Sequence, residues 1–252
     1  MTTLGHSRSP VRRGVFYAGL LLVAAALPGS AGLAAEDIEA PSEGFEYLGK
    51  IRPRHARDIE SSNWAVGAET MGRQYTVYAN WREYLGPLGA KRARIQSGWA
   101  RTEQEKGKYD WAWLDEIIPD MIDQGVQPWV CLCYGNPIYP GGGGTGLGGG
   151  LPSTPEAKKA WEAFVDAFVE RYGDQISEWE VWNEPQGGVE GVPGYADLVV
   201  RTADVIRRRQ PSAHIMVAAG GAFDVNFVDA LLGLLKEQDK LQLVDEVVYH
   251  PY

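Results

Sequence analysis

Cysteine and histidine are scarce in this chain of 252 residues, which contains two cysteines and four histidines. Cys131 and Cys133 stand two apart in an apolar segment typical of a strand. Strand geometry would place them on one face roughly 6.6 Å apart, near the upper limit for a disulfide. A metal site would need further cysteine or histidine ligands close by, and the sequence offers none there. We therefore expect two buried free thiols, no metal and no other cofactor.

The sequence has no long apolar run of the kind that spans a membrane. Its longest run covers residues 15–27, follows Arg12 and Arg13, and gives way to Pro28-Gly29 and a series of small residues. This pattern predicts an export signal over residues 1–35, with a retained membrane anchor as the alternative. Arg12-Arg13 resembles a twin-arginine signal only weakly. We expect a secreted or periplasmic protein that has no membrane contact after the signal is cleaved.

Basic residues are outnumbered, with 24 Lys and Arg against 33 Asp and Glu and a formal charge of −9. The predicted signal carries three arginines and no acidic residue, so its removal would change the charge to −12. An acidic surface repels polyanions and argues against nucleic acid as a partner. A neutral substrate fits this charge balance better.

A chain of this length that is 44% hydrophobic can bury one sizeable core. We expect a signal over residues 1–35, a polar lead-in over 36–61 and one domain over 62–252. Short apolar runs alternate in that domain with amphipathic stretches, which is typical of successive βα units. The runs are apolar on both faces, which favours parallel strands covered on both sides. The expected strands cover residues 64–68, 92–97, 127–133, 176–183, 214–219 and 243–250.

Helices are expected between these strands. One begins after Asp110 and ends at Gly125, and another begins at a capping box formed by Ser153 and Glu156. The second helix carries an apolar stripe at helical spacing, which we interpret as core and not as a platform for sugars. The stripe consists of Trp161, Phe164, Val165, Phe168, Val169 and Tyr172. Further helices are expected over residues 195–209 and 225–237.

Six strand-helix units predict a (β/α)8 TIM barrel that is truncated after strand six. An open, doubly wound six-stranded sheet is the alternative, although neither its phosphate-binding turn nor a switch in topology that would place a ligand crevice is visible. Residues 144–149 match a dinucleotide-binding glycine pattern, but Leu151-Pro152 separates them from the following helix. We interpret residues 141–150 as a mobile loop at the rim of a substrate cleft.

The segment from Trp179 to Pro185 reads Trp-Glu-Val-Trp-Asn-Glu-Pro. Because proline biases the preceding residue toward an extended conformation, Glu184 should stand at the carboxyl end of a strand, where barrel enzymes keep their chemistry. Trp179, Val181 and Trp182 would then form apolar walls that raise the pKa of Glu184 and keep a transferable proton. The alternative is an ordinary strand end with a solvated Glu.

This motif, together with an arginine on the second strand and a His-Pro-Tyr sequence after the sixth, resembles the clan of retaining glycoside hydrolases built on (β/α)8 barrels. The resemblance covers residues 62–252. Tyr109-Asp110-Trp111 and Gln127-Pro128-Trp129 are most similar to the β-xylosidase and α-L-iduronidase family, glycoside hydrolase family thirty-nine, although cellulase-like families share much of this pattern.

The resemblance implies that Glu184 is the general acid/base and that Asn183 binds the 2-hydroxyl of the sugar. It also implies that Arg94 contacts the nucleophilic carboxylate. A structural ion pair between Arg94 and Glu180 inside the barrel is the alternative, and both could hold. For Asn183 the alternative is a capped loop. The clan's nucleophile is a Glu at the end of a seventh strand, which this sequence does not contain.

The resemblance further implies that His250 and Tyr252 orient the sugar and the carboxylate at the mouth of the sixth strand. A buried core histidine is the alternative for His250. Trp99 follows the second strand and could stack on a sugar, or pack beneath the neighbouring loop.

The leading hypothesis is an exported enzyme that hydrolyses O-glycosidic bonds in poly- or oligosaccharides by a retaining double displacement. A noncatalytic carbohydrate-binding or inactive barrel fragment is the second hypothesis, because no carboxylate of a seventh strand is present. A hydrolase that uses a metal or a nucleophilic serine is disfavoured by the scattered histidines and by the lack of a G-x-S-x-G sequence.

Overall fold

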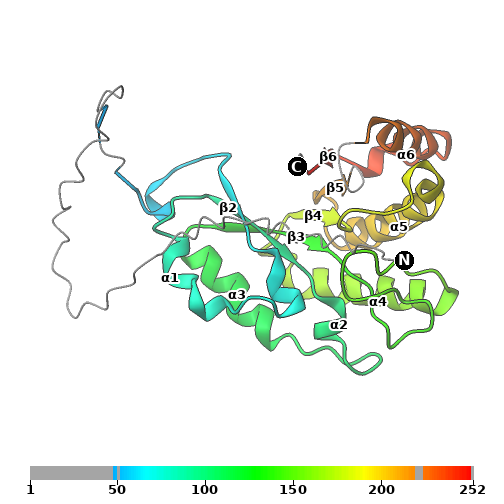
Figure 1. Cartoon of the computed structure of the whole chain (residues 1–252), viewed down its shortest axis with the longest axis horizontal. Helices are drawn as coiled ribbons and strands as arrows, with labels where there is room; N and C mark the ends of the chain where they lie inside the picture. Colours follow the sequence, from blue (N-terminus) through cyan, green and yellow to red (C-terminus); the bar gives the residue numbers. More distant parts are fainter. Residues whose placement is uncertain (1–47, 50–51, 219–223, 251–252) are drawn as a thin grey trace, which may run out of the picture. The chain divides into compact units, whose positions relative to one another are not determined.

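The computed structural model describes residues 48–49, 52–218 and 224–250 (Figure 1). The predicted signal, most of the predicted lead-in, and Tyr252 lie outside these residues. No helix in the described part of the chain is both long enough and apolar enough to cross a membrane. Because residues 1–47 lie outside the described part of the chain, the predicted boundaries of the signal, the lead-in and the domain stay predictions.

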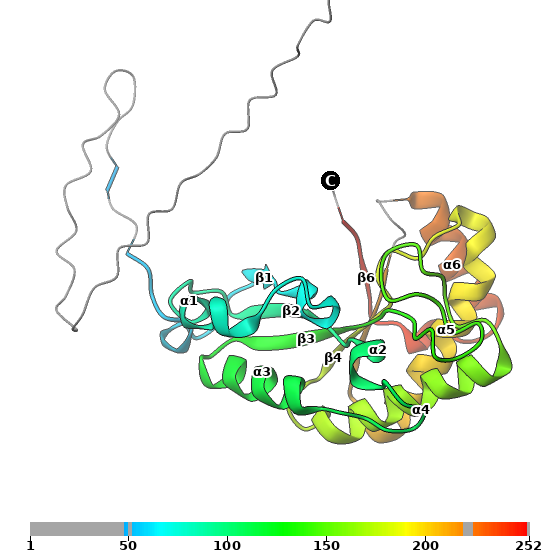
Figure 2. The ribbon, with the colours of Figure 1, turned by 60° about the horizontal axis from the view of Figure 1, so that its bottom comes forward.

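Six parallel strands form one sheet, and each strand pairs with its neighbours in sequence order. The strands are β1 (Ala65–Gly67), β2 (Arg92–Gln96), β3 (Gln127–Leu132), β4 (Glu178–Val181), β5 (His214–Ala218) and β6 (Glu246–Val248). The order never reverses, so the doubly wound alternative is excluded for this sheet. The structure confirms the predicted class, six successive units of a (β/α)8 barrel, and Figure 2 shows the sheet curling with its helices on the outer side.

Four of the six helices described between the strands, α3 to α6, correspond to predicted helices, whereas α1 and α2 were not predicted. They are α1 (Arg82–Leu85), α2 (Trp99–Thr102), α3 (Ala112–Asp123), α4 (Pro155–Tyr172), α5 (Gly188–Arg209) and α6 (Val225–Glu237). The described residues also contain four short 3-10 helices, namely η1 (Ala56–Asp58), η2 (Glu69–Arg73), η3 (Tyr78–Asn80) and η4 (Leu241–Leu243). Along the outer layer, α4 packs against α5 and α5 packs against α6.

Helix α5 begins seven residues earlier than the predicted start at Tyr195. Its first two turns contain three glycines and Pro193, which have low helix propensity and concealed the helical pattern in the sequence. Val192 and Tyr195 are both buried in this segment. Tertiary packing therefore holds a helix start that local propensity disfavours.

The capping box predicted for α4 at Ser153 is wrong by one residue. Thr154 is the N-cap, and its Oγ1 accepts a hydrogen bond from the backbone N–H of Ala157 at 3.2 Å. Pro155 occupies the first helical position, where its missing N–H costs nothing. The Ser153 hydroxyl instead donates to the carbonyl of Gly141, which ties the glycine-rich loop to the start of the helix.

The aromatic stripe on α4 is fully buried, as the sequence predicts, with six members at 3% exposure or less. Phe164 lies near its centre, and its ring centroid is 5.8 Å from Trp99 and 6.0 Å from Trp111. Because Trp99 and Trp111 belong to the connection between β2 and β3 and Phe164 to that between β3 and β4, their packing holds α4 against the segments that follow β2. The stripe is core and not a sugar platform.

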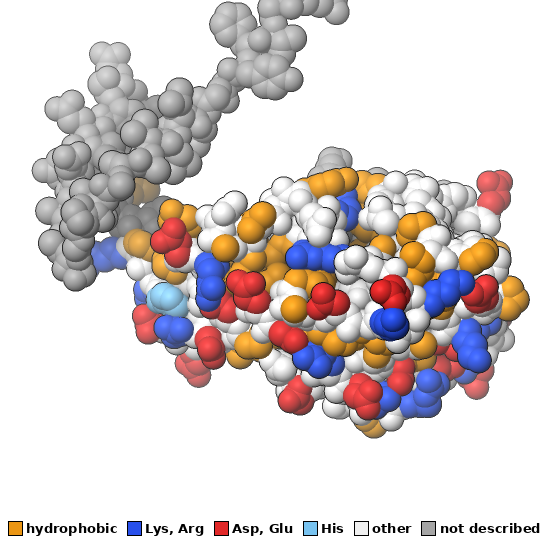
Figure 3. All heavy atoms as spheres, turned by 90° about the horizontal axis from the view of Figure 1, so that it is seen from below, with side chains coloured by type: hydrophobic (Ala, Val, Ile, Leu, Met, Phe, Trp, Pro, Cys, Tyr) orange, Lys and Arg blue, Asp and Glu red, His pale blue; other side chains and the backbone are white. Residues whose placement is uncertain are grey.

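Charges of both signs lie side by side on the face shown in Figure 3. Ion pairs join neighbouring helices of the outer layer, and two of them are bidentate. Arg171 on α4 donates two hydrogen bonds to the carboxylate of Asp115 on α3, and Arg209 on α5 donates two to that of Asp166 on α4. Each pair is about one third or more exposed, so it contributes little to stability.

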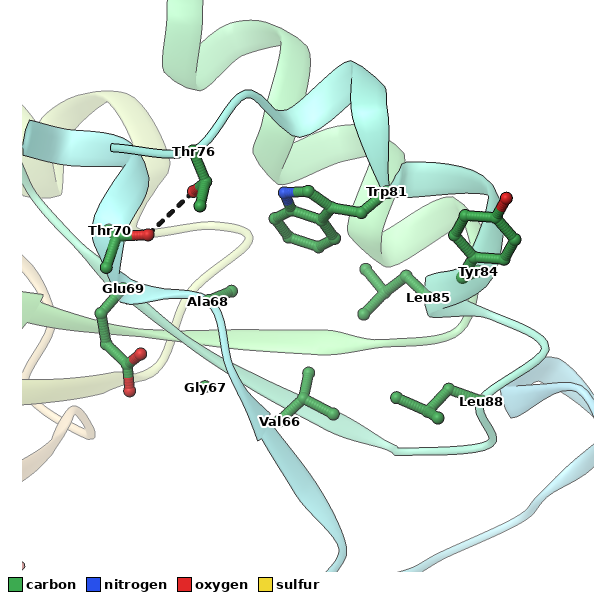
Figure 4. Close-up of a pocket in the computed structure, with 10 residues that line it drawn as sticks. All are labelled: Val66, Gly67, Ala68, Glu69, Thr70, Thr76, Trp81, Tyr84, Leu85 and Leu88. Atoms are coloured by element: carbon green, nitrogen blue, oxygen red, sulfur yellow. Dashed lines mark hydrogen bonds between the residues drawn. The ribbon is translucent and has the colours of Figure 1, made fainter. Parts of the chain in front are cut away.

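The edge of β1 that faces away from β2 has no partner strand among the described residues. An apolar cavity of about 430 Å³ lies along this edge, where Val66 and Ala68 face Trp81, Leu85 and Leu88 (Figure 4). The Glu69 carboxylate points away from these apolar side chains in the same view. The Glu69 carboxylate, which follows β1, instead lies near the guanidinium of Arg94.

Candidate active site

The end of β4 is sharply bent and does not continue as the predicted strand to residue 183. The strand stops at Val181, and Trp182 and Glu184 adopt positive φ values of 66° and 49°. The prediction of an extended Glu184 is therefore wrong, because proline disfavours the right-handed helical region but the residue here occupies the left-handed one. Left-handed backbone at non-glycine residues is strained and is common at functional sites.

The bend changes which side chains surround Glu184. Trp179 lies on the outer face of the sheet, where its Nε1 donates to Gln210 Oε1 at 2.8 Å. Trp182 also faces the helices, with its ring centroid 5.7 Å from that of Trp161 on α4. Trp179 therefore does not form the predicted apolar wall beside Glu184, because strand alternation directs it away from the inner face.

Glu184 instead contacts a histidine from another strand end. His250 Nδ1 lies 2.6 Å from Glu184 Oε1, and the two side chains are 18% and 16% exposed. His250 follows β6, so the carboxyl ends of β4 and β6 converge at one point. The carboxyl is thus shielded from bulk solvent and is held by a group that can donate or accept a proton.

Arg94 on β2 contacts three polar side chains in the interior of the barrel, those of Glu180, Glu69 and Asn183. Its Nε and Nη2 donate to the two carboxylate oxygens of Glu180 on β4, at 2.7 and 2.5 Å. Its Nη1 lies 3.5 Å from a carboxylate oxygen of Glu69. Arg94 is 8% exposed and Glu180 is 1% exposed, so the predicted ion pair inside the barrel is confirmed. The expected contact of Arg94 with a nucleophile stays a prediction.

Asn183 joins this network to the strand end. Its Oδ1 accepts from Arg94 Nη2 at 2.9 Å, and its Nδ2 donates to the Tyr134 hydroxyl at 2.9 Å. Burial raises the pKa of Tyr134, so this hydroxyl stays protonated. The Asn183 side chain is therefore fixed in orientation while it keeps one N–H and one lone pair for a ligand.

Trp99 does not lie where a sugar could stack on it. Its exposed fraction is zero, its Nε1 donates to Glu103 at 2.5 Å, and its rings pack against Tyr139 and Phe164. The assignment of Trp99 to substrate binding is thus corrected in favour of the packing alternative. Trp99 lies on α2, and the buried Glu103 links it to the segment before the rim loop, since it accepts a hydrogen bond from the Tyr139 hydroxyl.

The two cysteines beneath the site are buried free thiols, as predicted. Their sulfur atoms lie 3.5 Å apart on β3 and just after it. Burial, followed by the hydrogen bond to Cys133, raises the pKa of Cys131, so this thiol stays protonated and is a poor nucleophile.

Sequence reasoning missed Glu69 and Tyr134. Both follow a strand by two residues, Glu69 after β1 and Tyr134 after β3, and in a parallel sheet such positions meet at one edge. A systematic search for polar side chains just past each strand would have found them. The rim loop that follows Tyr134 is tied by backbone hydrogen bonds, for example from Gly135 N to Gly144 O at 2.9 Å. The predicted mobility of this loop stays a prediction.

Several solved structures share this arrangement of strands and helices. A family 39 glycoside hydrolase from Bacteroides cellulosilyticus superposes with a TM-score of 0.58 at 22% identity, over 74% of this chain and 38% of that one. The fold is that of the barrel glycoside hydrolases. A family 39 enzyme from Xanthomonas axonopodis pv. citri gives a TM-score of 0.50 at 24% identity, over 70% of this chain and 38% of that one. The predicted resemblance, family thirty-nine included, is confirmed at the level of the fold.

Sequence comparison gives shorter matches. A probable inactive β-glucosidase 14 from Oryza sativa subsp. japonica is 27% identical over 142 residues, which are 49% of this chain and 27% of that protein. A coniferin β-glucosidase from Pinus contorta is 27% identical over 161 residues, 57% of this chain and 30% of that protein. The matches thus span less than a third of either relative. A scan against models of protein families finds no match.

Proposed function

We propose that this chain is part of a retaining glycosidase that hydrolyses O-glycosidic bonds in poly- or oligosaccharides, with Glu184 as its general acid/base. The observation that carries the proposal is the pair of Glu184 and His250, 2.6 Å apart where the ends of β4 and β6 meet. The barrel fold of glycoside hydrolases and the similarity to β-glucosidases support it.

The chemistry needs a proton for the departing oxygen and a second carboxylate for the positive charge that develops at the anomeric carbon. Glu184 supplies the proton, and His250 fixes the carboxyl that holds it. In retaining enzymes the same residue then removes a proton from the attacking water. The Glu184 side chain is 16% exposed, so its carboxyl is largely shielded from bulk water when it protonates the departing oxygen.

Asn183 and Arg94 serve the substrate and the intermediate in this proposal. Asn183 is held by Arg94 and Tyr134 so that its remaining N–H and lone pair meet the 2-hydroxyl of the sugar. That hydrogen bond strengthens as the oxocarbenium-like transition state forms. Arg94 provides positive charge at the barrel centre that also favours a nearby anionic nucleophile.

The nucleophile is the part of the mechanism that these residues do not provide. Glu180 is committed to Arg94 by two hydrogen bonds and is 1% exposed, so it is a poor candidate. We propose a glutamate from residues beyond this sequence, at the end of the strand that would follow β6. Retention requires it to lie roughly 5–5.5 Å from Glu184. Tyr252 would orient this carboxylate.

The test uses the full-length protein, meaning this chain with any residues that its gene encodes beyond Tyr252. Glu184→Ala should lower kcat on alkyl glycosides by roughly 10²–10⁴, because their leaving groups need a proton. Aryl glycosides with acidic leaving groups should lose much less, and added azide should restore turnover as a β-glycosyl azide. The matched control is Glu190→Ala on the exposed start of α5, which should leave both rates unchanged.

Equal losses on both kinds of substrate would reject the acid/base role of Glu184. Binding of oligosaccharides by a wild-type protein that turns over neither substrate would instead favour the noncatalytic carbohydrate-binding hypothesis. We also propose export to the periplasm or medium, which N-terminal sequencing of the mature protein tests. A mature protein that still begins at Met1 would contradict it.

A further inference from the structure

A second cavity lies beside the candidate active site, between η2 and α2. It measures about 510 Å³, and its polar walls are Arg73, Gln74, Tyr75, Arg101, Gln104 and Thr145. All of these follow the carboxyl ends of β1, β2 or β3, the same end of the sheet as Glu184. The two glycines Gly72 and Gly98 let η2 approach α2 closely, since a Cβ on Gly98 would lie 3.1 Å from the Gly72 Cα.

The charge of this cavity is opposite to that of the chain as a whole. Two arginines line it and no acidic residue does, although the formal charge of the protein is −9. Neither Arg73 nor Arg101 has an ion pair with any described residue, whereas most other arginines of the domain are paired. Burial lowers the pKa of Arg101, while the charge of Asp110 acts in the opposite direction.

Both guanidinium groups are held in place by aromatic rings. Arg73 lies 4.9 Å from the ring centroid of Tyr75 and 5.4 Å from that of Tyr134. Arg101 lies 4.1 Å from the ring of Trp113 and donates from Nη1 to the carbonyl of Met71 at 2.7 Å. Stacking orients a guanidinium without neutralising it, so both groups keep donors for an anion.

Two buried polar atoms near Arg73 have no hydrogen-bond partner. They are the Nε of Arg73 itself and the Oε1 of Gln96, whose residue is 3% exposed. Orphaned buried polar atoms are costly and often mark a position that a ligand or water fills. Gln96 lines a small adjoining cavity together with Arg73, Arg101 and Tyr134.

The adjoining cavity measures about 20 Å³, and Tyr134 in its wall links it to the candidate active site. Tyr134 borders it, and the Tyr134 hydroxyl accepts the hydrogen bond from Asn183, which neighbours Glu184. Arg73 lies over the ring of the same Tyr134, 5.4 Å from its centroid, so a saccharide that extends from Asn183 past Tyr134 would approach Arg73. The cavity volume suits one or two sugar units.

We propose that this cavity is a subsite for a sugar unit that carries an anionic group, a carboxylate or a sulfate, and that Arg73 and Arg101 bind that group. The proposal rests on the glycosidase function above and makes the substrate an acidic saccharide. It replaces the expectation of a neutral substrate, which considered only the total charge. The unit concerned is not the one whose bond is cleaved but a neighbouring unit.

The experiment measures binding and not turnover. In the full-length protein, Glu184→Gln prevents hydrolysis, and calorimetry compares three probes of equal length: xylotetraose, xylotetraose with one glucuronate group, and xylotetraose with one sulfate group. At least one anionic probe should bind about ten-fold tighter than the neutral one, because hydrogen bonds to a charged group are strong. Raising the salt concentration should reduce this preference.

Variants then locate the preference. Arg73→Gln should reduce the ratio of anionic to neutral affinity to near one, and Arg73→Lys should retain part of it because the charge remains. The matched control is Arg54→Gln, at an exposed arginine that does not line the cavity, which should keep the ratio. Arg73 is the better position to vary, because Arg101 also supports the carbonyl of Met71.

The outcomes separate this proposal from the glycosidase function. Equal affinity for all three probes, no measurable binding of any, or a preference that survives Arg73→Gln overturns the anionic subsite, even if the wild-type enzyme hydrolyses neutral glycosides. An anionic preference that depends on Arg73, in a protein that shows no turnover, supports the subsite and rejects the catalytic proposal. A carboxylate preferred over sulfate identifies the substrate unit as a uronate.

Discussion

The ion pair between Arg94 and Glu180 is the most consequential contact that can be broken without changing the shape of the site. Glu180→Gln keeps the size of the side chain but removes a charge that is 1% exposed. It leaves Arg94 with one partner at 3.5 Å, the carboxylate of Glu69, and with the amide oxygen of Asn183. The protein would then hold a buried guanidinium that is poorly compensated.

The magnitude follows from the geometry. Two charge-assisted hydrogen bonds of 2.7 and 2.5 Å are lost or weakened, and removal of one partner of a buried pair costs about 3–5 kcal/mol. Glu69 offsets part of this cost because it can approach Arg94 more closely. We therefore expect the free energy of unfolding of the full-length protein to fall by about 3 kcal/mol.

Urea denaturation followed by circular dichroism measures this change, and the slope with denaturant should stay the same. The matched control is Glu162→Gln, which breaks the half-exposed pair with Arg201 and should cost less than about 1 kcal/mol. In a second arm, the double variant Arg94→Met, Glu180→Leu should recover most of the lost stability, since an apolar pair needs no compensation. A Glu180→Gln protein within about 1 kcal/mol of wild type, or a double variant less stable than the single one, would refute the reasoning.

Two further predictions concern the outer layer. Thr154→Ala should lower the free energy of unfolding by about 0.5–2 kcal/mol through loss of the α4 cap, whereas Ser153→Ala should cost less, and the reverse order would restore the capping box at Ser153. Burial, then the charges of Glu103 and Asp166, raises the pKa of Tyr109 to about 12, above its usual value near 10. The folded state thus favours the protonated phenol, and the stability it contributes should be present below pH 10 and be lost as pH rises to about 12. Urea titrations at several pH values measure the free energy of unfolding, and Tyr109→Phe should remove this part of its decrease at alkaline pH. The control Tyr84→Phe, at an exposed position, should not change the decrease. Identical pH profiles for wild type and Tyr109→Phe would contradict the assignment.

The sequence determined the class of the fold, because the spacing of apolar residues within each short segment is enough to indicate a buried strand or an amphipathic helix. Apolar residues on both faces of each run require a covered parallel sheet, and the α4 stripe from Trp161 to Tyr172 requires a helix that buries one side. The same reasoning found the free thiols and raised the ion pair of Arg94 with Glu180 as an alternative, since a charge on a buried strand normally needs an opposite charge. The structure places the two residues on β2 and β4, with β3 between these strands.

Only the tertiary structure decided how the residues meet at the ends of the strands. The left-handed backbone at Trp182 and Glu184 turned Trp182 toward the helices, and the sequence favoured a continuous strand because such a conformation is held by packing and not by local preference. Trp99 was ambiguous for a similar reason, because a tryptophan after a strand can face a ligand or the core until its neighbours are placed. The structure also revealed the cavity lined by Arg73 on η2 and Arg101 on α2. The net negative charge of the chain could not indicate it, because a total charge does not say where charges of one sign gather.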